Sequence, residues 1–180
     1  MKILVLSDTH HSIDKALEVY RKYDHIDLVI HCGDYVSDAL DFQRQTAAKV
    51  VYVNGNCDKS FDEKDYQILE TECGNLLISH GHMQNVSYSQ QSIYYLACEN
   101  NCIAAIYGHT HIPVNTKWEG VHLINPGSIS KPRDGSKGSY ALITTSKDGL
   151  NCDIIYLDNS AKPKVKGGYL KGLLNYSDRF

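Results

Sequence analysis

Short apolar runs recur along the first part of the chain and alternate with stretches in which apolar residues repeat at helical spacing. The apolar runs predict strands over residues 3–6, 26–31 and 49–53, and the stretches between them predict helices over 12–23 and 37–45. Strand, helix and strand joined by short connections form βαβ units, so we expect these strands to pair in parallel.

The pattern changes after residue 65, where strands outnumber helices. One helix is predicted over 89–100, and further strands are predicted over 66–72, 76–79, 103–107, 114–118, 121–124, 139–145 and 152–157. The first two form a hairpin, and the last four are expected to be antiparallel. We therefore expect one α/β domain over 1–180, with a parallel-to-mixed sheet, a second sheet supplied by the C-terminal half, and helices outside.

Polar segments follow five of the predicted strands directly. They are Asp8-Thr9-His10, Gly33-Asp34, Gly55-Asn56-Cys57-Asp58, His80-Gly81-His82 and Gly108-His109-Thr110-His111. Because ligands bind outside the carboxyl ends of the strands in open α/β sheets, these segments are expected to converge. Asp, Asn and neutral His are ligands of first-row metals, and seven such side chains are too many for one ion. The sequence therefore predicts a two-metal hydrolytic site.

Each of these segments is weak evidence when taken alone. Gly-Asp is a common turn dipeptide, and a lone Asp-x-His is more often a capped turn than a metal site. The five segments together favour a metal site over ordinary turns, because all five lie at predicted strand ends and four contain a glycine that allows close backbone approach. His80 and His82 are alternate residues of an extended segment, so both imidazoles can point to one side.

Composition and charge narrow the class of protein. The 180 residues suffice for one sizeable core, and 42% apolar with 22% charged residues is ordinary for a globular domain. The net charge of −3 argues against electrostatic binding of long nucleic acids. We expect nucleic acid to be a partner only in the form of a small diester substrate. Residues 161–180 form a basic tail, interpreted as solvated or docked on its own domain. An apolar face over 169–174 leaves a homo-oligomer open.

The cysteines and the absence of targeting signals predict a cytoplasmic protein. The six cysteines include no Cys-x-x-Cys pair, and the first apolar run is too short for a signal sequence or a membrane span. We therefore expect reduced thiols and no membrane partner.

The order of the five segments resembles the calcineurin-like metallophosphoesterase superfamily, and most of all its small bacterial and archaeal branch of YfcE-type phosphodiesterases. The segment 125–133, which begins Asn125-Pro126-Gly127-Ser128, extends the resemblance, so that it covers about residues 1–157. The resemblance implies a four-layer α/β/β/α sandwich with mixed sheets and a dinuclear metal centre. One ion would be held by Asp8, His10, Asp34 and His111, and the other by Asp34, Asn56, His80 and His109, with Asp34 bridging both.

The sequence departs from many superfamily members at Cys57, where they carry a histidine thought to assist the leaving group. A thiol is a doubtful acid at neutral pH. The small bacterial branch shares this cysteine, so the departure favours that branch and weakens the case for a protein phosphatase.

The expected chemistry is in-line attack on phosphorus by a metal-activated hydroxide, with no covalent enzyme intermediate. His82 is expected either to contact phosphate or protonate the leaving group, or to be a hydrogen-bonded structural histidine. Asp58 is expected to orient Asn56 or a neighbouring histidine. His11 is interpreted as helix-capping or exposed, and Arg133 as a surface residue that can also reach a substrate phosphate or a partner subunit.

Mixed nitrogen and oxygen ligation suits two divalent ions of the first transition row. The resemblance favours Mn, with Ni, Co, Fe or Zn as alternatives. The predicted function is a metal-dependent phosphodiesterase acting on a small phosphodiester or phosphate ester. Two alternatives stay open, a phosphomonoesterase or nucleotidase on the same site and a non-catalytic scaffold of the same fold.

Overall fold

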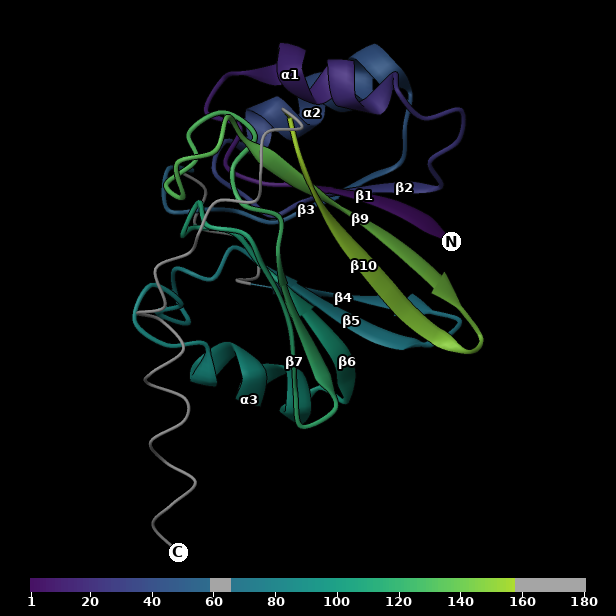
Figure 1. The fold of residues 1–180 in the computed structure, drawn as a ribbon, viewed down its shortest axis with the longest axis vertical. Helices are drawn as coiled ribbons and strands as arrows, with labels where there is room; N and C mark the ends of the chain where they lie inside the picture. The colour runs from purple at the N-terminus through teal and green to yellow at the C-terminus, as the bar shows by residue number, and fades with distance from the viewer. Residues whose placement is uncertain (59–65, 158–180) are drawn as a thin grey trace, which may run out of the picture.

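The computed structural model describes residues 1–58 and 66–157, and these form four stacked layers. Helices α1 (Ile13–Tyr20) and α2 (Val36–Thr46) cover one sheet, a second sheet stacks beneath it, and α3 (Gln91–Glu99) covers the far side (Figure 1). The predicted four-layer α/β/β/α arrangement is confirmed. The predicted tail over 161–180, with its apolar face over 169–174, lies outside the described residues.

The first sheet has the strand order β10-β9-β1-β2-β3. Its strands are β1 (Lys2–Leu6), β2 (Leu28–His31), β3 (Val50–Tyr52), β9 (Ser139–Ser146) and β10 (Gly149–Tyr156). The three N-terminal strands are parallel, as expected from their βαβ pattern. Strand β9 pairs antiparallel with the other edge of β1, in a register that sets Lys2 opposite Thr144.

The second sheet has the order β4-β5-β6-β8-β7. Its strands are β4 (Tyr66–Thr71), β5 (Gly74–Ser79), β6 (Cys102–Ile106), β7 (Val114–Trp118) and β8 (Val121–Asn125). Strands β4 and β5 form the predicted hairpin, and β6 lies parallel to both β5 and β8.

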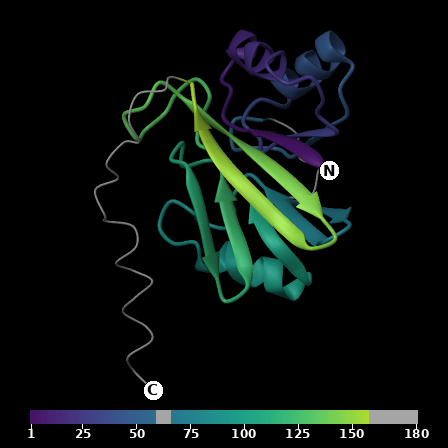
Figure 2. The same cartoon turned by 45° about the vertical axis from the view of Figure 1, so that its right-hand side comes forward.

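One expectation about the C-terminal half is confirmed and another is corrected. The hairpins β7–β8 and β9–β10 are antiparallel as predicted, but β8 runs parallel to β6. Strands β9 and β10 do not belong to the second sheet, because they extend the first sheet beside β1, where Figure 2 shows the long hairpin. Local alternation identifies a strand but carries no information about its distant partner.

The apolar runs of the first sheet are buried on both faces. In β1, Ile3 and Val5 pack between the two sheets, whereas Leu4 and Leu6 pack against the helices. This alternation follows from the period of two along a strand. On the far side, Ile93 of α3 packs against the outer face of the second sheet. Among the described residues, no helix is long and apolar enough to cross a membrane.

Candidate metal centre

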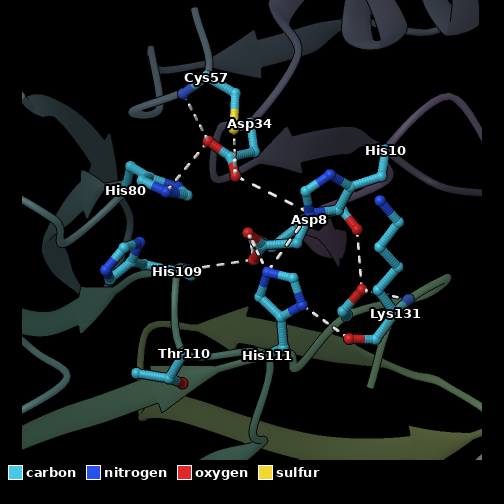
Figure 3. Close-up of polar contacts among 12 residues, drawn as sticks. Asp8, His10, Asp34, Cys57, His80, His109, Thr110, His111 and Lys131 are labelled. Carbon is cyan, nitrogen blue, oxygen red and sulfur yellow. Dashed lines mark hydrogen bonds and ion pairs between the residues drawn. The ribbon is translucent and has the colours of Figure 1, made fainter. Parts of the chain in front are cut away.

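All five polar segments meet at one edge of the molecule, where β1, β2, β3, β5 and β6 end. Asp8 and His10 follow β1, Asp34 follows β2, and the remaining segments follow the other three strands. Figure 3 shows side chains from both sheets pointing toward one another. The expected convergence at the carboxyl ends of the strands is thus observed.

The first group of side chains consists of Asp8, His10, Asp34 and His111. Their ligand atoms all lie within 4.8 Å of one another. His111 Nε2 lies 3.2 Å from Asp8 Oδ1 and 3.4 Å from His10 Nε2. His10 Nε2 lies 3.8 Å from Asp34 Oδ2. These are the four residues that the resemblance assigns to one ion.

The second group is built around the amide oxygen of Asn56. This oxygen lies 3.1 Å from His80 Nε2 and 3.0 Å from His109 Nδ1. His80 Nε2 is in turn 3.4 Å from Asp34 Oδ1. Asp34 therefore presents Oδ1 to the second group and Oδ2 to the first, so it lies between the two groups as a bridging ligand would.

Backbone carbonyls orient two of the imidazoles. His80 Nδ1 donates to the Cys32 carbonyl and His111 Nδ1 donates to the Lys131 carbonyl, each over 2.7 Å. A carbonyl can only accept, so in the neutral rings the proton is on Nδ1 and the lone pair of Nε2 faces the centre. Metal-ligating histidines are held by the same arrangement in known metal sites.

The site brings together atoms that carry lone pairs but no proton, so they cannot form hydrogen bonds with one another. Neutral His80 Nε2, Asn56 Oδ1 and Asp34 Oδ1 are all acceptors, yet they face one another. Asp8 is fully buried, and its Oδ1 accepts no hydrogen bond from the described residues. Such acceptors are compatible at these distances only when a cation or a proton lies among them. The donor set therefore fits divalent cations of the first transition row.

Burial and neighbouring charges set the protonation states around the centre. Burial opposes ionisation of Asp8, but the interactions of its carboxylate with the neighbouring imidazoles of His111 and His80 outweigh burial and lower the pKa of Asp8. Burial, and then the charges of Lys131 and His111, lower the pKa of His10, while burial and then His80 lower that of His109. Ionised carboxylates and neutral imidazoles are the forms that bind metals.

The backbone at the centre is strained. Five of the seven candidate ligands have positive φ angles between 44° and 67°, namely Asp8, His10, Asp34, His109 and His111. Each such residue costs ~1–3 kcal/mol, and residues of this kind cluster at functional sites. Two glycines make the loops fit, since a Cβ on Gly55 would overlap Asp34 and a Cβ on Gly108 would overlap the Ser7 hydroxyl.

The segment after β8 braces the loops that carry the ligands. Asn125 Nδ2 donates to the Gly108 carbonyl over 2.7 Å. The hydroxyls of Ser128 and Ser130 both donate to the Asp8 carbonyl, over 2.8 Å and 3.1 Å. This segment extends the family resemblance, and its contacts give that part of the resemblance a structural reason.

The structure places the remaining predicted site residues as follows. The His82 ring centroid lies 5.2 Å from that of His80 and 6.2 Å from that of His109, so His82 borders the second group. His11 is exposed, as expected, with its ring beside Tyr35. Arg133 is an exposed residue whose backbone N–H donates to the His111 carbonyl over 3.1 Å.

Asp58 differs from the expectation. Its Oδ2 accepts from the Gly55 N–H and its Oδ1 from the Val36 N–H, both over 2.8 Å. These bonds hold the backbone just before Asn56 and tie it to the start of α2. Both carboxylate oxygens of Asp58 are thus engaged with main-chain N–H groups, a role on the backbone that the expectation did not include.

Five contacts of the centre were missed by the sequence reasoning. Ser7 donates a 2.6 Å hydrogen bond to Asp8 Oδ2, and its place beside Asp8 is the only sequence signal for it. Cys57 contacts Asp34 twice, with its N–H 3.1 Å from Oδ1 and its Sγ 3.3 Å from Oδ2. The carbonyls that orient the histidines belong to Cys32 and Lys131, whose side chains give no hint of that role.

Comparison with known proteins agrees with this geometry. A family model described as the calcineurin-like phosphoesterase superfamily domain matches residues 1–148. The probable metallophosphoesterase YsnB of Bacillus subtilis is 32% identical over 149 residues, which cover 82% of this chain and 86% of that protein. The phosphodiesterase YfcE of Escherichia coli K12 is 29% identical over 168 residues, covering 79% and 87%.

A solved structure is also similar over nearly the whole fold. It is that of a conserved uncharacterised protein of Streptococcus pneumoniae TIGR4, described as a predicted phosphoesterase. It is 25% identical to this chain with a TM-score of 0.71, and the match covers 91% of this chain and 93% of the other. Fold, site geometry and sequence similarity therefore point to one family.

Proposed function

Because this chain belongs to the calcineurin-like phosphoesterase superfamily and is a hydrolase of phosphoester bonds, we propose that it is a phosphodiesterase that works with two divalent cations. The observation that carries the proposal is the position of Asp34, with one carboxylate oxygen toward each group of candidate ligands. A single carboxylate shared in this way is expected of a bridging ligand.

The residues divide into two ligand sets around Asp34. Asp8, His10 and His111 would complete the first set, and Asn56, His80 and His109 the second. Bound in this way, the cations would supply a nucleophile at neutral pH and neutralise charge on the phosphoryl oxygens. We take Mn as the preferred ion, with Ni, Co, Fe or Zn as alternatives that the same donor set accepts.

The charge of the ligand set favours an anionic substrate. Asp8 and Asp34 supply two negative charges, whereas Asn56 and the neutral histidines supply none, so two divalent cations leave the centre positive. His82 lies beside His80 and His109, where its ring can contact a phosphoryl oxygen or protonate a departing alkoxide. Asp58 and Cys57 act on the positions of Asn56 and Asp34 through the contacts described above.

A phosphodiester is the proposed substrate for two reasons. YfcE, a relative that matches most of this chain, is named a phosphodiesterase. In addition, Cys57 occupies the position of a histidine thought to assist the leaving group in many superfamily members, and burial raises the pKa of its thiol. A small ester with a good leaving group suits such a site. We further propose one domain over 1–180 and, from the six free cysteines, a cytoplasmic location.

The test compares hydrolysis of bis-p-nitrophenyl phosphate with that of p-nitrophenyl phosphate. Chelator-stripped protein is assayed alone and after addition of Mn²⁺, Ni²⁺, Co²⁺, Zn²⁺ or Mg²⁺. We expect metal-dependent turnover of the diester well above that of the monoester. Faster turnover of the monoester would indicate a phosphatase instead. No turnover by protein that binds two cations would indicate a scaffold that keeps the ligands without the catalysis.

A further inference from the structure

A buried carboxylate outside the two ligand sets is bonded to both neighbours of His10. Asp38 lies in the first turn of α2, and its side chain is only 6% exposed. Its Oδ2 accepts from the Thr9 hydroxyl over 2.6 Å and from the His11 N–H over 2.8 Å. Its Oδ1 lies 3.3 Å from His11 Nδ1. One carboxylate therefore fixes the residues on either side of His10.

Thr9 has a second buried partner, His31, at the end of β2. His31 Nε2 lies 3.0 Å from the Thr9 oxygen. Because the Thr9 hydroxyl donates to Asp38, it accepts from His31, so the proton of the neutral ring is on Nε2. Burial lowers the pKa of His31 to about 4 and so keeps the ring neutral. The three side chains form a chain of hydrogen bonds with one direction, from His31 through Thr9 to Asp38.

The loop that these bonds hold is strained. Asp8, His10 and His11 all have positive φ angles, of 52°, 44° and 65°. At ~1–3 kcal/mol each, such angles persist only where surrounding contacts enforce them. Ser128 and Ser130 secure the Asp8 carbonyl, which is the N-terminal end of the loop. Asp38 secures the C-terminal end, on the far side of His10.

We propose that Asp38, acting through Thr9 and with His31 behind it, is a positioning residue for the cation group that contains His10. This inference rests on the proposed function, since it concerns how the loop presents His10 to a cation. It predicts an effect confined to one group. The second group is held by other contacts, those of His80 with the Cys32 carbonyl and of Asp58 with Gly55.

The start of helix α2 brings Asp38 close in sequence to the shared candidate ligand Asp34. Asp34, between the two groups, comes just before the helix, and Asp38 lies in its first turn. The segment 34–38 thus carries both the shared ligand and the carboxylate that holds the loop of His10. A carboxylate that only stabilised the fold would, when removed, lower the stability and weaken both cation groups alike. Removal of a positioning residue for His10 would weaken cation binding to the first group alone.

The experiment measures Mn²⁺ binding to chelator-stripped full-length protein by titration calorimetry. Reference variants isolate the groups: Asn56→Ala keeps only the first, and His10→Ala keeps only the second. In the Asn56→Ala background, we expect Asp38→Ala and Thr9→Val each to lower the Mn²⁺ affinity of the remaining group about tenfold or more. Thr9→Ser, which keeps the hydroxyl, is expected to keep the affinity of the Asn56→Ala background. In the His10→Ala background, Asp38→Ala should change the affinity by less than about threefold.

Asp41→Asn is the matched control, since Asp41 lies one turn along α2, where it pairs with the exposed Arg44. It should bind Mn²⁺ as the unmodified protein does. Equal weakening of both groups by Asp38→Ala, or none in the first, would overturn the inference. If circular dichroism shows that Asp38→Ala does not fold, the near-isosteric Thr9→Val decides. Failure of the unmodified protein to bind two equivalents would instead refute the proposed function, so the two failures are distinguishable.

Discussion

The Ser128 hydroxyl donates a 2.8 Å hydrogen bond to the Asp8 carbonyl across 120 residues of sequence. The same hydroxyl oxygen accepts from the N–H groups of Lys131 and Ser130, over 2.8 Å and 3.2 Å. One buried side chain thus joins the loop after β1 to the segment that supplies the carbonyl partner of His111. The Ser128 oxygen therefore contacts both Asp8 and the residue whose carbonyl orients His111, and Asp8 and His111 are both candidate ligands of the first group.

Replacing Ser128 with alanine is therefore expected to destabilise the protein. Loss of a fully buried hydroxyl leaves main-chain groups without partners, at a cost of ~1–3 kcal/mol. Urea unfolding of chelator-stripped protein measures this change. Ser146→Ala is the control, because Ser146 is exposed and its hydroxyl accepts from the Asp148 N–H at the turn after β9. Equal changes in the two variants would contradict the bracing role of Ser128.

Removal of the Asp34 carboxylate is expected to abolish binding of both cations. Asp34→Ala takes away the oxygen that faces each group, so neither set keeps its shared ligand. Calorimetric titration with Mn²⁺ should fall from two equivalents to none, while Asp14→Ala, on the exposed side of α1, keeps two. Two equivalents bound by a folded Asp34→Ala variant would refute the bridging assignment.

Removal of the Cys57 thiol is expected to have little effect on a diester with a good leaving group. Burial raises the pKa of Cys57, so the thiol is protonated at neutral pH and is a weak donor to Asp34. The Cys57 N–H, which donates to the same carboxylate, is kept in Cys57→Ala. We expect kcat/KM for bis-p-nitrophenyl phosphate to stay within about threefold. A collapse of activity in folded protein would show that the thiol takes part in the chemistry.

His31 predicts a pH dependence of stability in the chelator-stripped protein. Burial lowers its pKa in the folded state to about 4, whereas the ordinary value is 6.5. Below pH 6.5 the unfolded chain takes up a proton that the folded protein refuses, so stability is lost as the pH falls from 6.5 toward 4. The loss from this residue is about 3 kcal/mol at pH 4.

The effect of His31 is isolated by comparison with His31→Gln, which keeps a donor near Thr9 but does not titrate. Urea unfolding of both proteins between pH 7 and 4 gives the difference in their free energies of unfolding. That difference should shift against the unmodified protein by about 3 kcal/mol as the pH falls. A difference that is constant with pH would show that His31 is not linked to folding.

The sequence predicted which side chains meet, because strand ends are a local property. Asp8, Asp34 and His80 each lie shortly after an apolar run, and parallel strands bring such positions to one edge. The residue types then indicate a metal site before any geometry is known. The family resemblance added the division of the ligands into two sets, which the structure brings together as two groups.

The features that the sequence could not predict are hydrogen bonds made by main-chain atoms and the pairing of strands that are distant in sequence. The carbonyl of Cys32 orients His80, but every residue has a carbonyl and nothing marks this one. Asp58 was expected to reach a side chain and instead bonds to two backbone N–H groups. The place of β9 beside β1 depends on contacts made across most of the chain, which the alternation within β9 does not specify.

The position of β9 has a consequence for how the protein is made. β1 lies inside the first sheet, yet its second neighbour is not synthesised until residues 139–146. All seven candidate ligands precede that point, since the last of them is His111. A chain growing from its N-terminus therefore leaves one edge of β1 open while every ligand has already emerged. Closure of this edge of β1 consequently follows the synthesis of every candidate ligand, and the sheet beneath the centre is finished only when residues 139–146 are in place.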